Sequence, residues 1–286
     1  MRFQFRLMRF RKIIYVVGAA LALWSAVSLA TKGLNYGIDF SGGILIEARP
    51  VKDGYGIAEM RSDLGAWKPE MQEDAKGNVL IRIGLIKNAT DDQQNRLVRE
   101  IKSALGDRVS YEQIQVVGPK IGDELIRGGI MAVIFAFIMM AIYVWIRYKG
   151  GYAVGAFISL AFDFLLMFGF FSITGLEFSQ VAIAVILTGT GYSINDKIVN
   201  YDRITENVRK YHKMPTDELI DLSVSEMFVR TQLTSITTAL GMIALLVFAG
   251  GVFGTFAVAM LFSIVSGTLS SIFISNALLI NFNIRD

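Results

Sequence analysis

The sequence contains no cysteine and a single histidine, His212, among its 286 residues. Without cysteine, neither a disulfide framework nor a thiolate metal site can form, and one histidine cannot make a histidine cluster. The sequence also lacks a recognisable nucleophile–base pair, metal motif or phosphate-binding loop. We therefore expect a protein that is not an enzyme and that holds neither a metal nor an organic cofactor.

Charged residues are also scarce, at 19% of the chain, whereas 53% of the residues are hydrophobic. The mean hydropathy is +0.48, and several apolar runs approach the roughly 20 residues that a transmembrane helix needs. This composition predicts a polytopic α-helical membrane protein. The pI of about 9.0 does not indicate nucleic-acid binding, because the lysines and arginines lie mostly beside the apolar runs.

The apolar runs predict six transmembrane helices, at residues 13–30, 125–146, 152–174, 178–199, 231–250 and 255–280. Residues 1–12 are basic and contain no acid, which places them in the cytoplasm by the positive-inside rule. Six spans then bring both termini to the cytoplasmic side. A cleaved signal peptide is the alternative for residues 13–30, but this run exceeds the apolar core of about 7–15 residues typical of signal peptides.

Residues 31–124 are the one long polar insertion, and after an outward first helix they form an external domain. Their 13 basic and 15 acidic residues nearly balance, and we interpret these charges as a solvated surface. Alternating patterns predict strands at 43–50, 68–74, 78–86 and 108–118, with helices at 56–66 and 90–106. The order βαββαβ predicts an α+β, ferredoxin-like domain.

Two further expectations concern the region after the fourth apolar run. Lys197 lies near the end of that run, and we expect its side chain to extend to the inner membrane interface. Residues 200–230 carry mixed charges, and their apolar positions predict a cytoplasmic amphipathic helix lying against the membrane.

Asp196 lies inside the fourth apolar run. A charge in the middle of a membrane helix costs ~2.5–3.5 kcal/mol on insertion scales, so such a residue indicates an ion or proton path. The helical period aligns Asp196 with further polar or small residues in a stripe that must face protein or water. The stripe consists of Thr188, Gly189, Tyr192, Ser193, Asp196, Asn200 and Arg203.

Asp163 is a second carboxylate within an apolar run, with Ser159 four residues earlier as its expected partner. It either joins a proton relay or makes a structural hydrogen bond to another helix. Arg230 opens the fifth run, and the small polar residues that follow it at helical spacing are Thr234, Thr237, Thr238 and Gly241. That face either packs against Asp196, or Arg230 only anchors the helix at the interface.

The sixth run contains a repeat of small residues at strict four-residue spacing. Such a stripe is typical of a packing seam between helices rather than of a binding site. Its members are Ser263, Gly267, Ser271 and Ser275.

Three blocks of the sequence resemble the SecF family of the bacterial Sec protein-export machinery. They are GLNYGIDFSGG at 33–43, GYSINDKIVNYDRITEN at 191–207 and RTQLTSITT at 230–238, and the motif residues among them are Gly37, Asp39, Gly42, Gly43 and Arg203. The resemblance implies a relative of the proton-driven resistance-nodulation-division transporters in the bacterial inner membrane. Its implied partners are SecD, the SecYEG channel, often YajC, and unfolded preproteins that are pulled or released with protons as the coupling ion.

By the same resemblance, Asp196 is the proton-titrating carboxylate, Arg230 its basic partner, and Asn195 and Thr234 their neighbours. The chain departs from the family at two positions. Lys197 stands where a small hydroxyl residue is usual, which adds a cation beside the proton site. Phe162 precedes Asp163 where a histidine is common, which weakens the relay interpretation.

The sequence is also compatible with two alternative functions. One is a proton-driven small-molecule exporter of the same superfamily, although such exporters usually have about twelve spans. The other is a passive scaffold of the translocation channel, which only Asp196 and Arg230 argue against.

Overall fold

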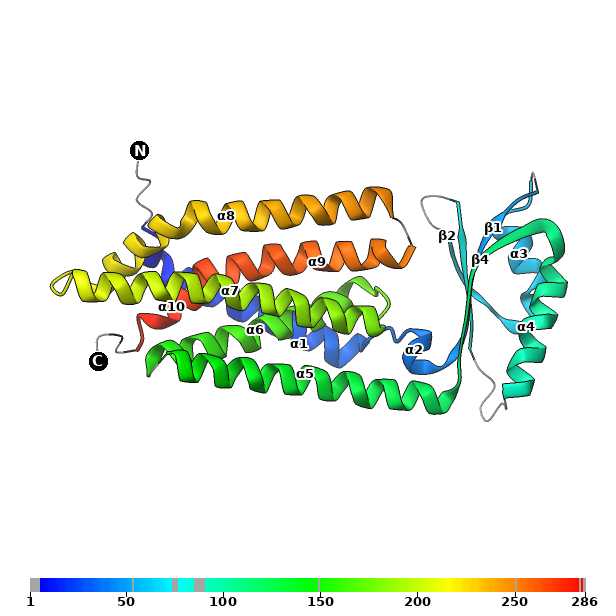
Figure 1. Ribbon diagram of the computed structural model, residues 1–286, viewed down its shortest axis with the longest axis horizontal. Helices are drawn as coiled ribbons and strands as arrows, with labels where there is room; N and C mark the ends of the chain where they lie inside the picture. The colour runs from blue at the N-terminus through cyan, green and yellow to red at the C-terminus, as the bar shows by residue number, and fades with distance from the viewer. Residues whose placement is uncertain are drawn as a thin grey trace.

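The computed structural model describes residues 6–52, 54–73, 77–84, 91–148, 150–249, 251–282 and 284. The chain forms an elongated molecule with a helix bundle at one end and a small α/β domain at the other (Figure 1). The first bundle helix, α1 (Arg11–Lys32), begins at the end of the bundle far from the α/β domain, and α10 (Asn276–Leu279) also lies there.

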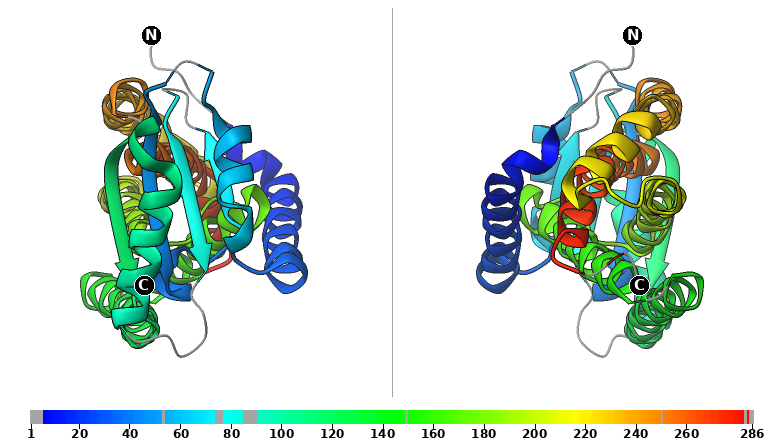
Figure 2. Two further views of the ribbon diagram at one scale, coloured as in Figure 1. Left: turned by 90° about the vertical axis from the view of Figure 1, so that its right-hand side faces the viewer. Right: turned by 90° about the vertical axis from the view of Figure 1, so that its left-hand side faces the viewer.

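The α/β domain has one antiparallel sheet in the order β2-β3-β1-β4. The strands are β1 (Gly43–Pro50), β2 (Glu70–Glu73), β3 (Val79–Gly84) and β4 (Val109–Val117), each within its predicted range. Helices α3 (Ile57–Asp63) and α4 (Asp91–Leu105) cover the face of the sheet that points away from the bundle (Figures 1 and 2). Alternate strand residues such as Ile44, Ile46 and Ile81 are fully buried beneath these helices.

Within the described residues, five helical segments are long and apolar enough to cross a membrane: Leu7–Lys32, Ile121–Arg147, Gly151–Thr174, Thr216–Phe248 and Phe253–Leu279. They correspond to α1, α5 (Pro119–Arg147), α6 (Gly151–Thr174), α8 (Thr216–Phe248), and α9 (Gly251–Leu269) with its continuation. Helices α6 and α9 are largely buried, whereas α1, α5 and α8 lie at the periphery (Figure 2). The more polar α7 (Gln180–Lys210) runs beside them (Figure 1).

The region after the fourth apolar run differs from its prediction. Residues 200–210 continue α7, and α8 begins at Thr216 after Pro215 and runs without interruption to Phe248, so 200–230 contains no separate amphipathic helix. The polar groups there pair between the two helices. Asn207 donates to the Ser223 hydroxyl and to Glu226, both at 2.9 Å, and Arg203 Nε donates to Glu226 at 2.7 Å. Because these groups satisfy one another, the two helix ends pack together.

Candidate functional site

Helix α7 packs closely against α9 because small residues lie at their contact. A Cβ atom on Gly189 would stand 1.9 Å from Ser263 Oγ, and one on Gly267 would stand 2.8 Å from Ser193 Cβ. Ser271 Oγ donates to the Ser193 carbonyl at 3.2 Å, and Ser275 Oγ donates to the Tyr201 hydroxyl at 2.7 Å. The predicted serine stripe is therefore a packing seam, as expected.

The end of this seam contains a feature that the sequence did not indicate. Residues Ser270–Ser275 form a π-helical turn between α9 and α10. Such turns are rare and often lie near functional sites. Here the turn places Ser270 against α6 and Ser271 against α7, so it lies between the two helices that carry buried charges.

Asp163 of α6 and Lys197 of α7 form an ion pair inside the bundle. Lys197 Nζ donates to Asp163 Oδ2 at 2.5 Å and to Ser193 Oγ at 2.6 Å, and Ser193 Oγ donates to Asp163 Oδ2 at 2.7 Å. The lysine side chain is 1% exposed and the aspartate side chain 6%. The three residues thus form a closed triangle of donors and acceptors, which we call the Asp163 triad.

The Asp163 triad corrects two expectations. Lys197 does not extend to the membrane interface, because the carboxylate of Asp163 lies within its reach in the interior. Ser159 does not bind Asp163 either, since its hydroxyl lies 3.0 Å from that of Ser270. The interpretation of Asp163 as a hydrogen-bonding partner of another helix agrees with the structure, although the contact is an ion pair.

Asp196 is 2% exposed, and its carboxylate atom Oδ2 has no hydrogen-bond partner among the described residues. The positive charge that acts on this carboxyl group is that of Lys197, and the hydroxyl of Thr268 on α9 interacts with it. A buried polar atom without a partner is rare in folded proteins and calls for an explanation. Proton binding supplies one, because a neutral carboxyl group is cheaper to bury than a charged one.

The other predicted neighbours of Asp196 lie elsewhere. Arg230, Thr234 and Asn195 are exposed, and Arg230 forms no ion pair within the described part of the chain. The buried residues of α8 at this level are instead Thr231 and Ser235, and Ser235 Oγ lies 2.7 Å from Thr268 Oγ1. The structure therefore does not bring Arg230 and Asp196 together.

The exposed polar residues of α7 and α8 share one face. The Thr238 hydroxyl of α8 donates to the Tyr192 hydroxyl of α7 at 3.4 Å, and helical spacing places the exposed polar residues on either side of this contact. This α7–α8 polar face consists of Thr188, Gly191 and Asn195 on α7 and of Arg230, Thr234, Thr237 and Gly241 on α8.

The first motif block ties the α/β domain to the start of α7. The Gly37 amide donates to the Phe178 carbonyl at 3.0 Å, and the Phe178 amide donates to the Asn35 carbonyl at 2.7 Å. Asp39 Oδ2 accepts a hydrogen bond from the Gln180 amide at 3.2 Å, in the first turn of α7. A carboxylate is favourable there because a helix N-terminus carries partial positive charge. We call residues 33–43 and 175–180 together the motif junction.

The motif glycines lie where packing is close or where the backbone conformation is unusual for other residues. A Cβ atom on Gly37 would stand 2.2 Å from Glu177 Oε1. Gly42 has a φ of 71°, a conformation that side-chain-bearing residues rarely adopt. A Cβ atom on Gly43 would stand 2.9 Å from the Ile83 carbonyl oxygen of β3. These glycines, like Arg203, which pairs with Glu226 and Glu206, therefore have structural roles in the molecule.

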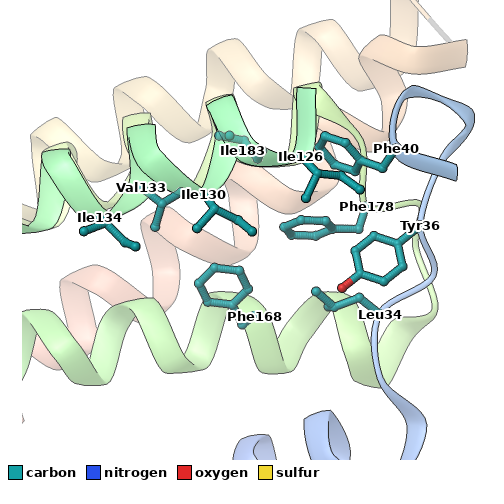
Figure 3. A pocket seen from close by; sticks show the side chains of 11 residues that line it. Leu34, Tyr36, Phe40, Ile126, Ile130, Val133, Ile134, Phe168, Phe178 and Ile183 are labelled. Atoms are coloured by element: carbon teal, nitrogen blue, oxygen red, sulfur yellow. The ribbon is translucent and has the colours of Figure 1, made fainter. Parts of the chain in front are cut away.

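An ion pair between Arg82 of β3 and Glu177 adds a charged contact between the sheet and the motif junction. Burial raises the pKa of Glu177, and the positive charge of Arg82 offsets part of that increase. An apolar cavity of about 390 Å³ lies beside the motif junction and is lined by residues of α5, α6 and α7. Tyr36, Phe40 and Phe178 line its end near the junction, and Phe168 of α6 lies farther along it (Figure 3).

These features define a class: a helical membrane protein with buried ionisable residues in its bundle and a small α/β domain at one end. Two regions of the sequence match descriptions of the same family. The family described as protein export membrane protein SecD/SecF, C-terminal, matches residues 97–285, and the SecD/SecF GG motif matches residues 27–53. The chain therefore belongs to the SecD/SecF family.

Similar curated proteins are SecF subunits of protein translocases. Those of Rickettsia bellii (strain OSU 85-389) and Rickettsia prowazekii (strain Madrid E) are 38% and 37% identical to the chain over 285 and 291 residues. The alignments cover 97% and 98% of this chain, and 93% and 92% of the relatives. The chain is thus a membrane-embedded bacterial protein with an accessory role in Sec translocation.

Solved structures agree with this assignment. The crystal structure of SecDF, a translocon-associated membrane protein from Thermus thermophilus, matches 97% of this chain with a TM-score of 0.84 and 31% sequence identity. A SecDF structure in a super-membrane-facing form matches 98% with a TM-score of 0.73. The chain spans 38% and 39% of the lengths of those SecDF chains.

Proposed function

We propose that the chain works with SecD in the Sec preprotein translocase and uses the proton motive force to promote completion and release of protein export after the ATP-driven steps. The observation that carries this proposal is the buried carboxylate of Asp196, with one oxygen unpartnered among the described residues, on the helix whose first turn is tied to the α/β domain. In this function the chain is not an enzyme, and protons are its only coupling ion.

The proposed topology has six transmembrane helices in the bacterial inner membrane, both termini in the cytoplasm, and an external α/β domain. Helix α7, the fourth span in chain order, is the proposed span that comes in addition to the five apolar helices. It is 31 residues long, and the charges in its middle are compatible with a membrane because Asp196 and Lys197 are buried by other helices. The external domain has the ferredoxin-like arrangement, a proposal supported by the order β1-α3-β2-β3-α4-β4 and the sheet order β2-β3-β1-β4.

SecD is the proposed occupant of the α7–α8 polar face. In a bilayer, an arginine and several hydroxyl groups exposed to lipid are unfavourable, whereas small and polar residues are typical of contacts between membrane helices. We further propose that the assembled complex contacts the SecYEG channel and YajC, and that the external domain meets unfolded preprotein on its outer side.

Proton binding at Asp196 is the proposed coupling step. One elementary charge that crosses a potential of about 100 mV is worth ~2.3 kcal/mol, so a few protons suffice to bias a two-state motion. Arg230, on the adjacent helix and on the proposed SecD-facing surface, influences this equilibrium when α8 or the partner moves. Because α7 carries Asp196 and also begins at the motif junction, a change at the carboxylate is transmitted to the external domain.

The test replaces Asp196 with Asn, which keeps the size of the side chain but removes its ability to titrate. Asp196→Asn and Arg230→Ala should each leave membrane insertion and SecD assembly intact, yet abolish the part of preprotein export that an uncoupler removes from wild-type inverted vesicles. If Asp196→Asn vesicles with assembled complex keep the full uncoupler-sensitive export, the scaffold function becomes the better explanation.

A further inference from the structure

The charged residues buried in the bundle are few. Among the described residues, the buried charged side chains are Asp163, Asp196, Lys197 and Asp221, and the last of these accepts a hydrogen bond from the Met8 amide at 3.0 Å near the start of α8. Apart from Asp163, the described residues of α6 carry no charged side chain. The described residues of α9 and of its continuation to Leu279 carry none either. Two carboxylates and one ammonium group therefore form the charged interior at the level of α7.

Lys197 forms hydrogen bonds with only one of the two carboxylates. Its ammonium group donates to Asp163 Oδ2 and to Ser193 Oγ, and no hydrogen bond joins it to Asp196. Lys197 reaches Ser193 because a helical side chain points back over the preceding turn, where the residue four positions earlier lies. Asp196 is adjacent to Lys197 in sequence, but consecutive residues on a helix do not face each other. The ammonium group is thus fixed on the side of Asp163.

The pairing of Lys197 with Asp163 determines how the three buried charges are compensated. An ionised Asp163 and a protonated Lys197 neutralise each other, and the Ser193 hydroxyl completes the triangle. One oxygen of each carboxylate, Asp163 Oδ1 and Asp196 Oδ2, has no hydrogen-bond partner among the described residues. Asp163 nevertheless has a charged partner in Lys197, whereas Asp196 forms no ion pair in the described chain, and Arg230 is exposed. Breaking a buried ion pair by removing one partner is strongly unfavourable, because the remaining charge stays buried.

We propose that Lys197 is the counter-ion of Asp163, and that this pairing keeps Asp163 ionised and outside proton exchange, so that Asp196 is the carboxylate of the bundle that binds the coupling proton. Lys197 is a positioning residue in this proposal, and Asp163 is not a proton carrier. The inference rests on the proposed role of Asp196 and extends it by assigning the two neighbouring charges.

The proposal predicts how each single substitution changes protonation. In Lys197→Met, Asp163 is a buried carboxylate without a counter-ion, and it takes up a proton. In Asp163→Asn, Lys197 is a buried cation without a counter-ion, and it releases its proton. The double variant Asp163→Asn/Lys197→Met removes both charges together and leaves the interior with Asp196 alone.

Infrared difference spectroscopy of the full-length protein in lipid nanodiscs, titrated with pH, counts protonated carboxyl groups directly. The wild-type and Asp163→Asn spectra should show the same protonated-carboxyl bands, and Lys197→Met should gain one band that the double variant lacks. A band lost from the wild type in Asp163→Asn, or no gain in Lys197→Met, overturns the proposal. The Asp196→Asn spectrum tests the proposed proton site by itself. If this variant loses no protonated-carboxyl band, Asp196 is not the proton site. The pairing of Lys197 with Asp163 is tested independently by the Asp163→Asn and Lys197→Met spectra.

Export measurements add a rescue test. Each single variant leaves a second group beside Asp196 that can exchange protons, and it should lose the uncoupler-sensitive part of export. The double variant should regain that part because both extra groups are gone. Lys197→Arg, which keeps the cation, should retain it, and Lys210→Met, an exposed lysine on the same helix, is the matched control. If the double variant is as inactive as the single variants while its complex assembles normally, Asp163 itself carries protons and the proposal is wrong.

Discussion

Gly189 allows α7 and α9 to pack closely because it has no side chain. Its Cα faces Ser263 of α9 so closely that an added Cβ would stand 2.7 Å from Ser263 Cβ. Real Cβ atoms do not approach so closely, so any larger residue must push α7 away from α9. This contact lies two helical turns from Asp196, and it therefore helps to set the depth at which the carboxylate is buried.

Gly189→Ala should destabilise the protein by about 1–3 kcal/mol, the usual cost of overpacking. The unfolding midpoint in detergent, measured by intrinsic fluorescence, reports this loss. Gly191→Ala is the matched control, because Gly191 is exposed and a Cβ there would meet nothing within 4 Å. Equal midpoints for the two variants would show that the α7–α9 contact tolerates an added methyl group.

At the scale of elements, the motif junction joins the sheet, the end of α1 and the start of α7. The contacts are of different kinds: backbone hydrogen bonds to Phe178, the Asp39 carboxylate at the first turn of α7, and the Arg82–Glu177 ion pair. Because Gly37 permits Glu177 to lie against the backbone, the glutamate is partly buried despite its charge. The junction therefore contains a titratable group.

The raised pKa of Glu177 gives the junction a pH dependence of known sign. The folded protein holds the Glu177 proton more tightly than the unfolded chain, so this residue's contribution to stability falls as pH rises from about 4.3, the pKa of a free glutamate, through the folded-state pKa. Glu177→Gln should flatten that decline while Arg82 keeps a hydrogen-bond acceptor. Unfolding midpoints across this pH range provide the measurement, and parallel curves for wild type and variant would contradict it.

At the scale of the whole molecule, α8 exposes two different surfaces. One is apolar and includes Leu233, Ile236 and Leu240, as expected for contact with lipid. The other is its part of the α7–α8 polar face. The two surfaces predict different neighbours, a bilayer on one side and a protein on the other.

Crosslinking distinguishes these neighbours, and the absence of native cysteine makes each introduced cysteine unique. Thr234→Cys and Thr237→Cys should crosslink to co-purified SecD with a short bifunctional reagent. Ile236→Cys and Leu240→Cys, on the apolar surface of the same helix, should not. Crosslinks of equal yield from both surfaces would argue against the proposed docking face.

Local pattern sufficed for much of the α/β domain, because alternating residues such as Ile44, Ile46 and Ala48 directly reflect the two faces of a strand. It also sufficed to find Asp196 and Asp163 as unusual carboxylates. Their partners were not predictable, because the contact of Lys197 with Asp163 depends on how α6 and α7 are aligned, which no local pattern encodes. On α8, polar residues occupy adjacent faces, so spacing alone did not distinguish Thr231 and Ser235 from Arg230 and Thr234.

The uninterrupted course of α7 has a mechanical consequence. At about 1.5 Å of rise per residue, Asp196 lies roughly 24 Å along the axis from the first turn, where Asp39 binds the Gln180 amide. If the helix tilts as a rigid rod about the level of Asp196, a tilt of about 10° displaces that first turn by roughly 4 Å. The helix then acts as a lever, so side-chain adjustments too small to open the bundle suffice to move the motif junction and the sheet attached to it.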